Sequence, residues 1–209
     1  MLTIFVIVFI NLVGFGIIIP LLPFYGEHYG ASPEKVTALM ATYSLFQFLF
    51  APIWGYISDR VGRKPILIIS LLGTIFAYLL LAVAPNLIWL FVARAIAGIM
   101  AGSISAAFAF MADITTREDR TKGMGIIGSA FGLGFIAGPA IGGFLAGGDI
   151  NNTNFQAPAY YAAGFAALAS ILSVFFLRES LPAIKRQNWQ LKFKPIQSLK
   201  TINLKLPPD

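Results

Sequence analysis

Arg94 is the residue whose type and surroundings say most about chemistry, because it is a lone charge within a long apolar stretch. The segments 65–93 and 95–112 on either side of it contain no charged residue. In the middle of a membrane helix an arginine costs about 2.5–3.5 kcal/mol on an insertion scale, and such residues usually face an aqueous cavity or a partner. The alternative is an arginine that reaches up to a membrane interface. We expect Arg94 to have a functional role.

A second group of chemically capable residues lies in the segment GYISDRVGRKP, which we interpret as a loop. Its first glycine, Gly55, permits close helix contact, and Gly62 permits a tight turn. Asp59 is an acceptor near a helix end. The basic side chains can pair with carboxylates or with helix C-termini; they are Arg60, Arg63 and Lys64. An ordinary basic loop is the alternative interpretation.

A glycine-rich segment, GIIGSAFGLGFIAGPAIGG, spans residues 125–143. Glycine and proline cost little in a membrane helix when neighbouring helices approach closely and the freed backbone groups find partners. The segment therefore predicts a smooth, kinkable helix face against which another helix can rock. The residues that define this face are Gly125, Gly134, Gly138, Pro139, Gly142 and Gly143.

A candidate ligand-binding face combines Tyr43, Gln47 and Phe50, which follow the i, i+4, i+7 spacing of one helix face. A cavity for a large, flat, amphipathic ligand needs such a face with few fixed charges. Tyr43 and Gln47 could equally be hydrogen-bond partners between helices. Phe131 is a further candidate of the same kind.

Residues for other kinds of chemistry are scarce. The chain has no cysteine and one histidine, His28, so thiolate and imidazole metal clusters are not expected. It shows no nucleophile–base pair and no phosphate-binding loop. We therefore expect neither an enzyme nor a resident cofactor or metal.

The elements that must position these residues follow from composition. An ordinary soluble domain has about 25% charged and about 45–50% apolar residues, whereas this chain has 11% and 57%. Its mean hydropathy is +0.78. A bilayer core needs about 20 apolar residues of helix, and the charge-free stretches supply six such helices, near 2–24, 36–57, 65–84, 87–112, 122–147 and 157–177.

The basic residues predict the orientation. Assigning successive loops to alternate sides places 13 of the 15 Lys and Arg residues on one side, with Lys35 on the other and Arg94 inside the membrane. Loops rich in Lys and Arg are cytoplasmic. We therefore expect a multi-pass protein of the cell (inner or plasma) membrane with both termini cytoplasmic. Orientation accounts for the net charge of +6, so a nucleic-acid partner is not expected.

Two regions are expected: a six-helix transmembrane region at 1–180 and a basic cytoplasmic linker or tail at 181–209. The tail could lie on anionic membrane lipid, where each Lys or Arg near the surface contributes about 1 kcal/mol. It could also be a simple linker or topology anchor.

Three of these segments carry a resemblance to one family. The segment that begins at Gly55 resembles motif A of the major facilitator superfamily, G-x-x-x-D-R-x-G-R-[RK], at every defined position. The spacing from Gly125 to Gly143 reproduces motif C, the superfamily's antiporter signature. The segment Arg94–Gly102 resembles motif B of its drug antiporters.

The first helix is similar to the start of tetracycline and multidrug exporters, although Asn11 stands where tetracycline exporters of this type have an aspartate. Asparagine cannot exchange a proton, so a proton-coupling step is expected elsewhere. The resemblance places Asn11, Tyr43, Gln47 and Phe131 in a substrate cavity. It implies that Arg94 acts in proton coupling or in the charge balance of that cavity.

The resemblance also implies a conformational latch on the cytoplasmic side, whose charge pairs break and reform between inward- and outward-open states. Asp59 and Arg60 are the latch residues by this resemblance, within the motif that also contains Gly55, Gly62, Arg63 and Lys64. The segment with Asp113, after the fourth helix, looks like the counterpart from an inverted repeat.

The implied fold is all-α: six transmembrane helices arranged as two inverted three-helix repeats, half of a twelve-helix facilitator. The implied function is proton-coupled export of amphipathic drugs or similar small molecules by alternating access. The alternatives are a symporter for a sugar or metabolite and a non-transporting membrane subunit. A missing C-terminal half or a second copy would complete the working unit, and truncation is the interpretation that we favour.

Overall fold

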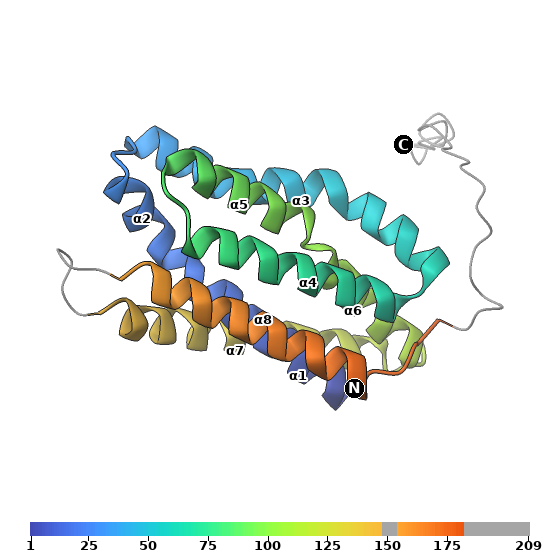
Figure 1. Ribbon diagram of the computed structural model, residues 1–209. Helices are drawn as coiled ribbons and strands as arrows, with labels where there is room; N and C mark the ends of the chain where they lie inside the picture. Colours follow the sequence, from blue (N-terminus) through green and yellow to red (C-terminus); the bar gives the residue numbers. More distant parts are fainter. Residues whose placement is uncertain (148–153, 182–209) are drawn as a thin grey trace, which may run out of the picture.

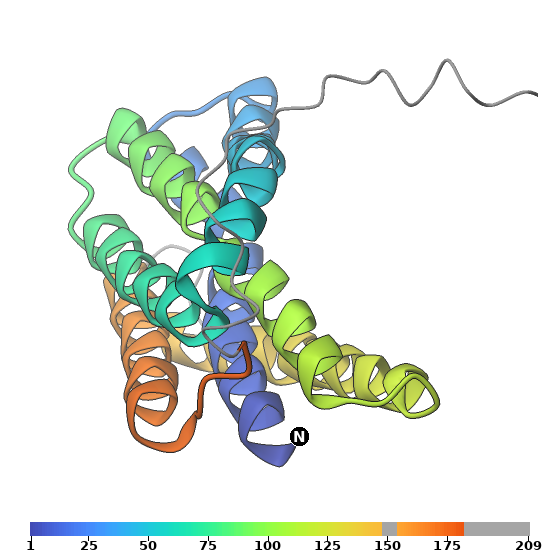
Figure 2. The same ribbon diagram turned by 90° about the vertical axis from the view of Figure 1, so that its right-hand side faces the viewer.

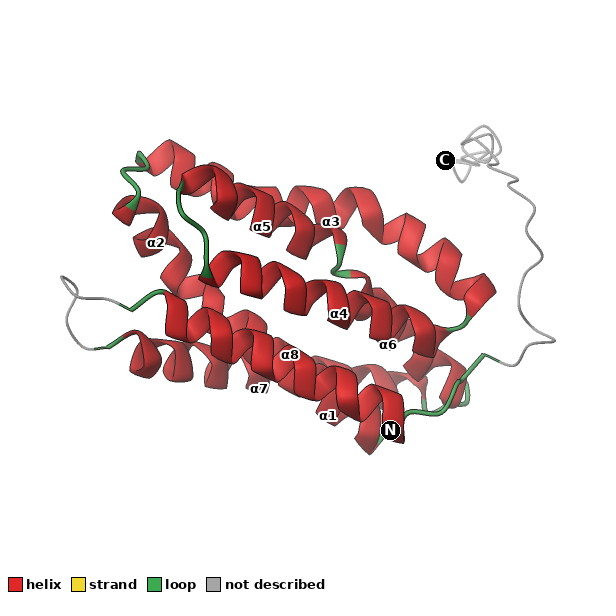
Figure 3. Ribbon diagram, viewed as in Figure 1, coloured by secondary structure: helices red, strands yellow, loops and turns green. Residues whose placement is uncertain are grey.

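The computed structural model describes residues 1–147 and 154–181, and every regular element within these residues is helical (Figure 3). The predicted tail 181–209 lies outside the described residues except for Leu181. In chain order the elements are α1 (Leu2–Ile18), the 3₁₀ helix η1 (Ile19–Leu21), α2 (Leu22–His28), α3 (Pro33–Val61), α4 (Arg63–Ala82), α5 (Leu87–Ile99), α6 (Gly102–Ile114), α7 (Arg120–Ala146) and α8 (Gln156–Phe176).

Six helical segments of this described part are long and apolar enough to cross a membrane, which confirms the predicted number. Two spans are each built from more than one helix. The first runs through α1, η1 and α2, and the fourth runs through α5 and α6. The expected boundaries agree within four residues, and the largest differences are at the ends of the first and second spans, which continue to His28 and Val61.

The predicted loop from Gly55 to Pro65 is therefore largely helical, which corrects that expectation. Only Gly62 separates α3 from α4, and its φ of +117° lies in the region that favours glycine. The tight turn predicted at Gly62 is confirmed. Because α3 continues through Asp59, the side chains of Asp59 and Arg63 are one helical turn apart in sequence and meet across this turn.

The fourth span is interrupted between Ile99 and Gly102. The indole Nε1 of Trp54 in α3 donates a hydrogen bond to the carbonyl of Ile99 at the end of α5. Gly102 opens α6 against the Trp54 ring, where an added Cβ would overlap the indole. The sequence predicted one continuous helix here, and the interruption follows from the bulky indole between α3 and this span.

Helix packing follows the two expected three-helix repeats. The first span packs mainly against α7 and α8, and the fourth span packs in the same way against α3 and α4. The third and sixth spans, α4 and α8, pack against each other. Figure 2 views the bundle from one end and shows α4 and α8 together at one side. Exchanging spans 1–3 for spans 4–6 reproduces this pattern, as an internal repeat requires.

The contact between α1 and α7 uses the glycine-rich face that the sequence predicted. An added Cβ at Gly134 would lie 2.7 Å from the Leu12 Cβ, and at Gly138 it would lie 2.6 Å from the Cα of Gly16. Gly142 is equally close to the backbone of Ile17, at 2.7 Å. Side chains at these positions would force the two helices apart, because packed interiors leave no spare space.

Two other motif glycines, Gly125 and Gly143, are exposed, and an added Cβ there would meet nothing within 4 Å. Pro139 lies within α7 directly beside the close contact, and its Cδ approaches the position of a Cβ on Gly16. The motif therefore divides into a packed stripe and open positions.

The connections alternate between the two ends of the bundle (Figure 1). The N-terminus, the turn between α3 and α4, the turn between α6 and α7, and the end of α8 lie at one end, which we call the charged end. At the opposite end, the hydroxyls of Tyr25 and Tyr29 donate to the carbonyls of Leu81 and Ala84, at 3.2 and 2.5 Å. This alternation places the predicted latch residues on one side.

Candidate functional site

At the charged end, Arg63 pairs with two carboxylates from different helices. Its Nη1 lies 2.7 Å from Oδ1 of Asp59 in α3, and its Nε lies 3.0 Å from Oδ2 of Asp113 in α6. The Arg63 side chain is only 11% exposed, so water screens these pairs less than it screens pairs on an open surface. Arg63, the first residue of α4, therefore holds the ends of three helices together.

Glu179, which the sequence analysis did not select, lies at the N-terminus of α4. Its Oε1 accepts a hydrogen bond from the backbone N–H of Arg63 at 2.9 Å, and its Oε2 accepts one from that of Lys64 at 3.3 Å. The first N–H groups of a helix have no partner within it and form the positive end of its dipole. The carboxylate of Glu179 therefore caps α4.

The side chain of Lys64 makes the reciprocal contact. Its Nζ donates to the backbone carbonyl of Val174 at 2.7 Å, in the last turn of α8, where the helix dipole favours a cation. Ser180, which follows Glu179, donates to Oδ2 of Asp113 at 3.1 Å. We call Asp59, Arg63, Lys64, Asp113 and Glu179 the charge cluster; it joins α3, α4, α6 and the segment after α8.

Two predicted latch residues lie apart from the charge cluster. Arg60 is buried, its guanidinium lies 3.2 Å from the centroid of the Tyr56 ring, and its Nη1 donates to the Tyr56 carbonyl at 2.9 Å. At Gly55 an added Cβ would meet nothing within 4 Å, so the predicted close helix contact is not made within the described residues.

The second region is a groove of about 530 Å³ along one face of the bundle, which we call the Arg94 groove. Residues of the first, second, fourth and fifth spans line it, and α4 and α8 contribute none. The predicted cavity residues Tyr43, Gln47 and Phe131 all line it together with Arg94. Phe15 and Phe135 complete an aromatic wall.

Arg94 lies near the middle of α5 and is 5% exposed. Its guanidinium carbon lies 4.5 Å from the ring centroid of Tyr43 and 6.0 Å from that of Phe15. Arg94 Nε and Nη1 are buried without a hydrogen-bond partner within residues 1–147 and 154–181. Aromatic faces attract a cation, so the rings stabilise the charge while leaving donors unused.

Asn11 does not line the Arg94 groove. It borders a separate cavity of about 20 Å³, together with Tyr43, Thr74, Tyr78 and Ser103. Its Oδ1 is buried and has no hydrogen-bond partner among the residues that the structure describes. Asn11, which was expected in the substrate cavity, therefore lies behind the wall of the groove. Tyr43 borders both spaces.

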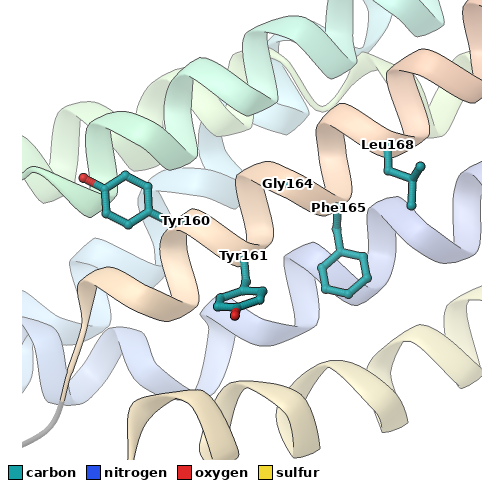
Figure 4. Close-up of a pocket in the computed structure, with 5 residues that line it drawn as sticks. All are labelled: Tyr160, Tyr161, Gly164, Phe165 and Leu168. Carbon is teal, nitrogen blue, oxygen red and sulfur yellow. The ribbon is translucent and has the colours of Figure 1, made fainter.

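A groove of about 350 Å³ on α8 provides a contrast (Figure 4). Tyr160, Tyr161, Gly164, Phe165 and Leu168 line it, and none of them carries a charge. Tyr161 and Phe165 point to one side of the helix, whereas Tyr160 points to another. An apolar helix surface of this kind is expected where a membrane protein contacts lipid.

A family model, described as Major Facilitator Superfamily, matches residues 4–206. The chain belongs to this superfamily. The match covers all six spans, and it confirms both the resemblance drawn from the three motifs and the prediction of a transporter rather than an enzyme.

Among curated relatives, the chain is 41% identical to the class E tetracycline resistance protein of Escherichia coli over 181 residues, covering 84% of this chain and 43% of that protein. It is 32% identical to multidrug resistance protein 2 of Bacillus subtilis (strain 168) over 211 residues, covering 99% and 52%. The chain thus spans about half the length of the curated relatives it matches.

Among solved structures, the human organic anion transporter MFSD10 (TETRAN) superimposes with a TM-score of 0.78 at 28% identity, over 88% of this chain and 48% of that one. A POT family transporter in complex with a thioalcohol-conjugated peptide matches with a TM-score of 0.76 at 18% identity, over 87% and 38%. The second likeness shows the fold alone.

The sequence did not single out Glu179, Phe15 or Phe135 as site residues. A signal for Glu179 exists, because it is the first acid after the sixth span in a segment that is otherwise basic until Asp209. Phe15 and Phe135 carried no signal, since they are two of 19 phenylalanines and nothing in their local sequence distinguishes them.

Proposed function

We propose that this superfamily chain is one six-helix half of a proton-coupled exporter that moves amphipathic, aromatic small molecules across the cell membrane by alternating access. The observation that carries the proposal is the Arg94 groove. Its volume of about 530 Å³ lies within the roughly 300–1,000 Å³ of small-molecule sites. Its wall combines four aromatic rings with one buried charge.

The named relatives support export of drugs over the two alternatives. Both relatives described above carry names of resistance proteins, one toward tetracycline and one toward several drugs. A symporter for a sugar or metabolite has no such support among them, and neither does a non-transporting subunit. The aromatic wall favours a flat, partly apolar ligand.

A second six-helix unit is part of the proposal. Only four of the 29 residues of α3 are buried, and its exposed side chains include Leu45, Phe48 and Leu49. The groove is lined by one unit alone, whereas facilitator-type sites lie between two units near the bilayer midplane. A C-terminal half or a second copy of this chain would cover the groove.

The charge cluster is the proposed latch. The charged end is the proposed cytoplasmic side because seven of the nine Lys and Arg residues that the structure describes lie at it. Releasing Arg63 from Asp59 and Asp113 would free the ends of α3, α4 and α6 to move. The proton carrier is Asp113 or a group of the second unit, because the span interiors of this unit contain no Asp, Glu or His.

Transport in everted membrane vesicles tests the proposal. The vesicles are made from cells that produce the whole transporter, which is this chain together with its second six-helix unit. With an acid interior, a fluorescent aromatic dye should accumulate inside, and a protonophore should abolish the accumulation. Proton symport predicts that the acid interior expels the dye, and a non-transporting subunit predicts no movement. The variant Ile171→Val, on the exposed face of α8, serves as a control that should retain full transport.

A further inference from the structure

Arg94 is a buried cation that has no carboxylate partner among the described residues. Within residues 1–147 and 154–181 the ion pairs are those of Arg63, and all acidic residues of this part lie near span ends or in connections. Two buried guanidinium nitrogens, Nε and Nη1, have no acceptor there. Buried charges are normally paired and hydrogen-bonded, so this region of the fold is incomplete without an acceptor from elsewhere.

The direction from which an acceptor can arrive is set by the groove. Arg94 is one of its lining residues, although 95% of its surface is covered. Phe15 and Tyr43 lie on the guanidinium, and their ring centroids are 4.9 Å apart. A group that enters the groove therefore meets the Arg94 side chain beside aromatic faces. Because Nε and Nη1 are themselves covered, a small shift of the guanidinium brings these donors to the bound group.

The rest of the wall extends this aromatic surface. Phe15 meets Phe135 edge-on at 5.9 Å, and Phe135 stacks with Phe131 at 6.5 Å. These rings form a row that begins at Arg94 and ends on α7. Aromatic rings prefer offset or edge contacts at such distances, so the row can take up a flat ring system.

We infer that Arg94 binds an anionic group of the exported compound, a carboxylate or a sulfonate, while the row of Phe15, Phe135 and Phe131 receives its aromatic rings. The inference rests on the proposed function and specifies its substrate class: aromatic compounds that carry an acidic group. Arginine suits this task because its guanidinium stays charged when buried and presents several donors to one oxyanion.

The test is a binding measurement that needs no proton gradient. The whole transporter, purified in detergent, is titrated into a xanthene dye with a free carboxylate and into the methyl ester of the same dye, and fluorescence anisotropy is recorded. We expect the carboxylate to bind at least about tenfold more tightly than the ester, because a hydrogen bond to a charged group contributes that much or more to affinity.

Variants assign the preference to Arg94. Arg94→Gln should bring the affinity for the carboxylate down to that for the ester and leave the ester within about twofold of the unmodified protein, because the ester makes no charged contact. Arg94→Lys should retain part of the preference for the carboxylate dye over its ester. This variant replaces Arg94→Gln in the test if the glutamine variant does not fold. Arg117→Gln removes one exposed charge outside the groove and should change neither affinity.

Equal affinities for the two dyes overturn the inference. Arg94 would then form an ion pair with an acidic residue of the second unit instead of binding the ligand. Binding of neither dye, or a preference that survives Arg94→Gln, also overturns it. Failure of the proposed function can be distinguished from failure of this inference. A protein that binds the carboxylate dye preferentially but does not move it along a proton gradient contradicts the exporter, whereas proton-driven export of both dyes without preference contradicts only the substrate class.

Discussion

The charge cluster and the Arg94 groove each contain an arginine, and the surroundings of the two arginines are opposite in kind. Arg63 lies at a helix end beside two carboxylates, and each contact is supplied by this chain. Arg94 lies in mid-helix among aromatic rings, with buried donors that residues 1–147 and 154–181 leave unused. The contacts of the cluster lie within one six-helix unit, whereas we propose that a bound group completes the contacts of the groove.

The difference follows from the cost of charge at two depths. At a membrane surface, water and helix ends stabilise charges, so several ionisable groups can gather and rearrange at small cost. In the bilayer interior a lone cation is expensive, which is why we propose a binding role for Arg94. A movable cluster suits a latch, and a fixed unpaired charge suits ligand recognition.

The largest effect is expected at the groove, from Arg94→Gln. Loss of a charge-assisted contact is expected to lower proton-driven dye accumulation by about 100-fold. Accumulation is measured in everted vesicles and normalised to the amount of transporter in the membrane. Arg117→Gln is the matched control, and an Arg94→Gln rate within about twofold of the control would remove Arg94 from the site.

A smaller effect is expected from breaking the charge cluster with Arg63→Gln. The substitution leaves Asp59 and Asp113 without the cation that both contact, so the turnover rate should fall about tenfold. Dye affinity in detergent should remain unchanged, because Arg63 does not line the groove. A loss of affinity at unchanged turnover would show that the two regions are not separate.

Glu179→Gln should have a weaker effect of the same kind. The amide oxygen can still accept one hydrogen bond, but the charge that faces the α4 dipole is lost, which is worth about 0.3–1 kcal/mol. We expect turnover to change by about two- to fivefold. Glu118→Gln, at the same end of the bundle, should leave turnover unchanged; an equal change in both variants would indicate a general effect of surface charge.

The smallest effect should come from Tyr43→Phe, which keeps the ring beside Arg94 and removes only the hydroxyl. We expect dye affinity to change by less than about twofold, since the cation–π contact remains. Tyr43→Leu removes the ring and should weaken binding more. If the phenylalanine and leucine variants bind equally well, the aromatic face does not contribute.

The fold was largely predictable because membrane helices are determined by length and by the absence of charge. Six spans and their repeat could be expected from the sequence alone. The breaks in the first and fourth spans could not, because apolar residues such as Met100 and Ala101 look the same in a continuous helix. Trp54, far away in sequence, fills the space beside that second break.

The site was predictable in part. Asp59, Arg63 and Lys64 were found because a motif fixes their spacing. Asp113 was expected as a latch residue in the repeat counterpart of that motif, and the structure adds its direct contact with Arg63, 50 residues away. Glu179 was missed, since its role depends on where α8 ends relative to α4. Arg60 and Asn11 belong to the segments from which the site was predicted, but neither lies in the expected site. Arg60 packs against Tyr56, and Asn11 borders a separate small cavity.

The sequence by itself determined that the chain spans a membrane six times and has one charged residue inside these spans. Hydropathy and charge belong to the individual residues, so they can be read without the fold. Only the tertiary structure decided which donors stay unused and which rings surround Arg94. It also decided that a carboxylate after the last span caps α4. Such contacts join residues on different helices, and local sequence does not specify how packed helices bring them together.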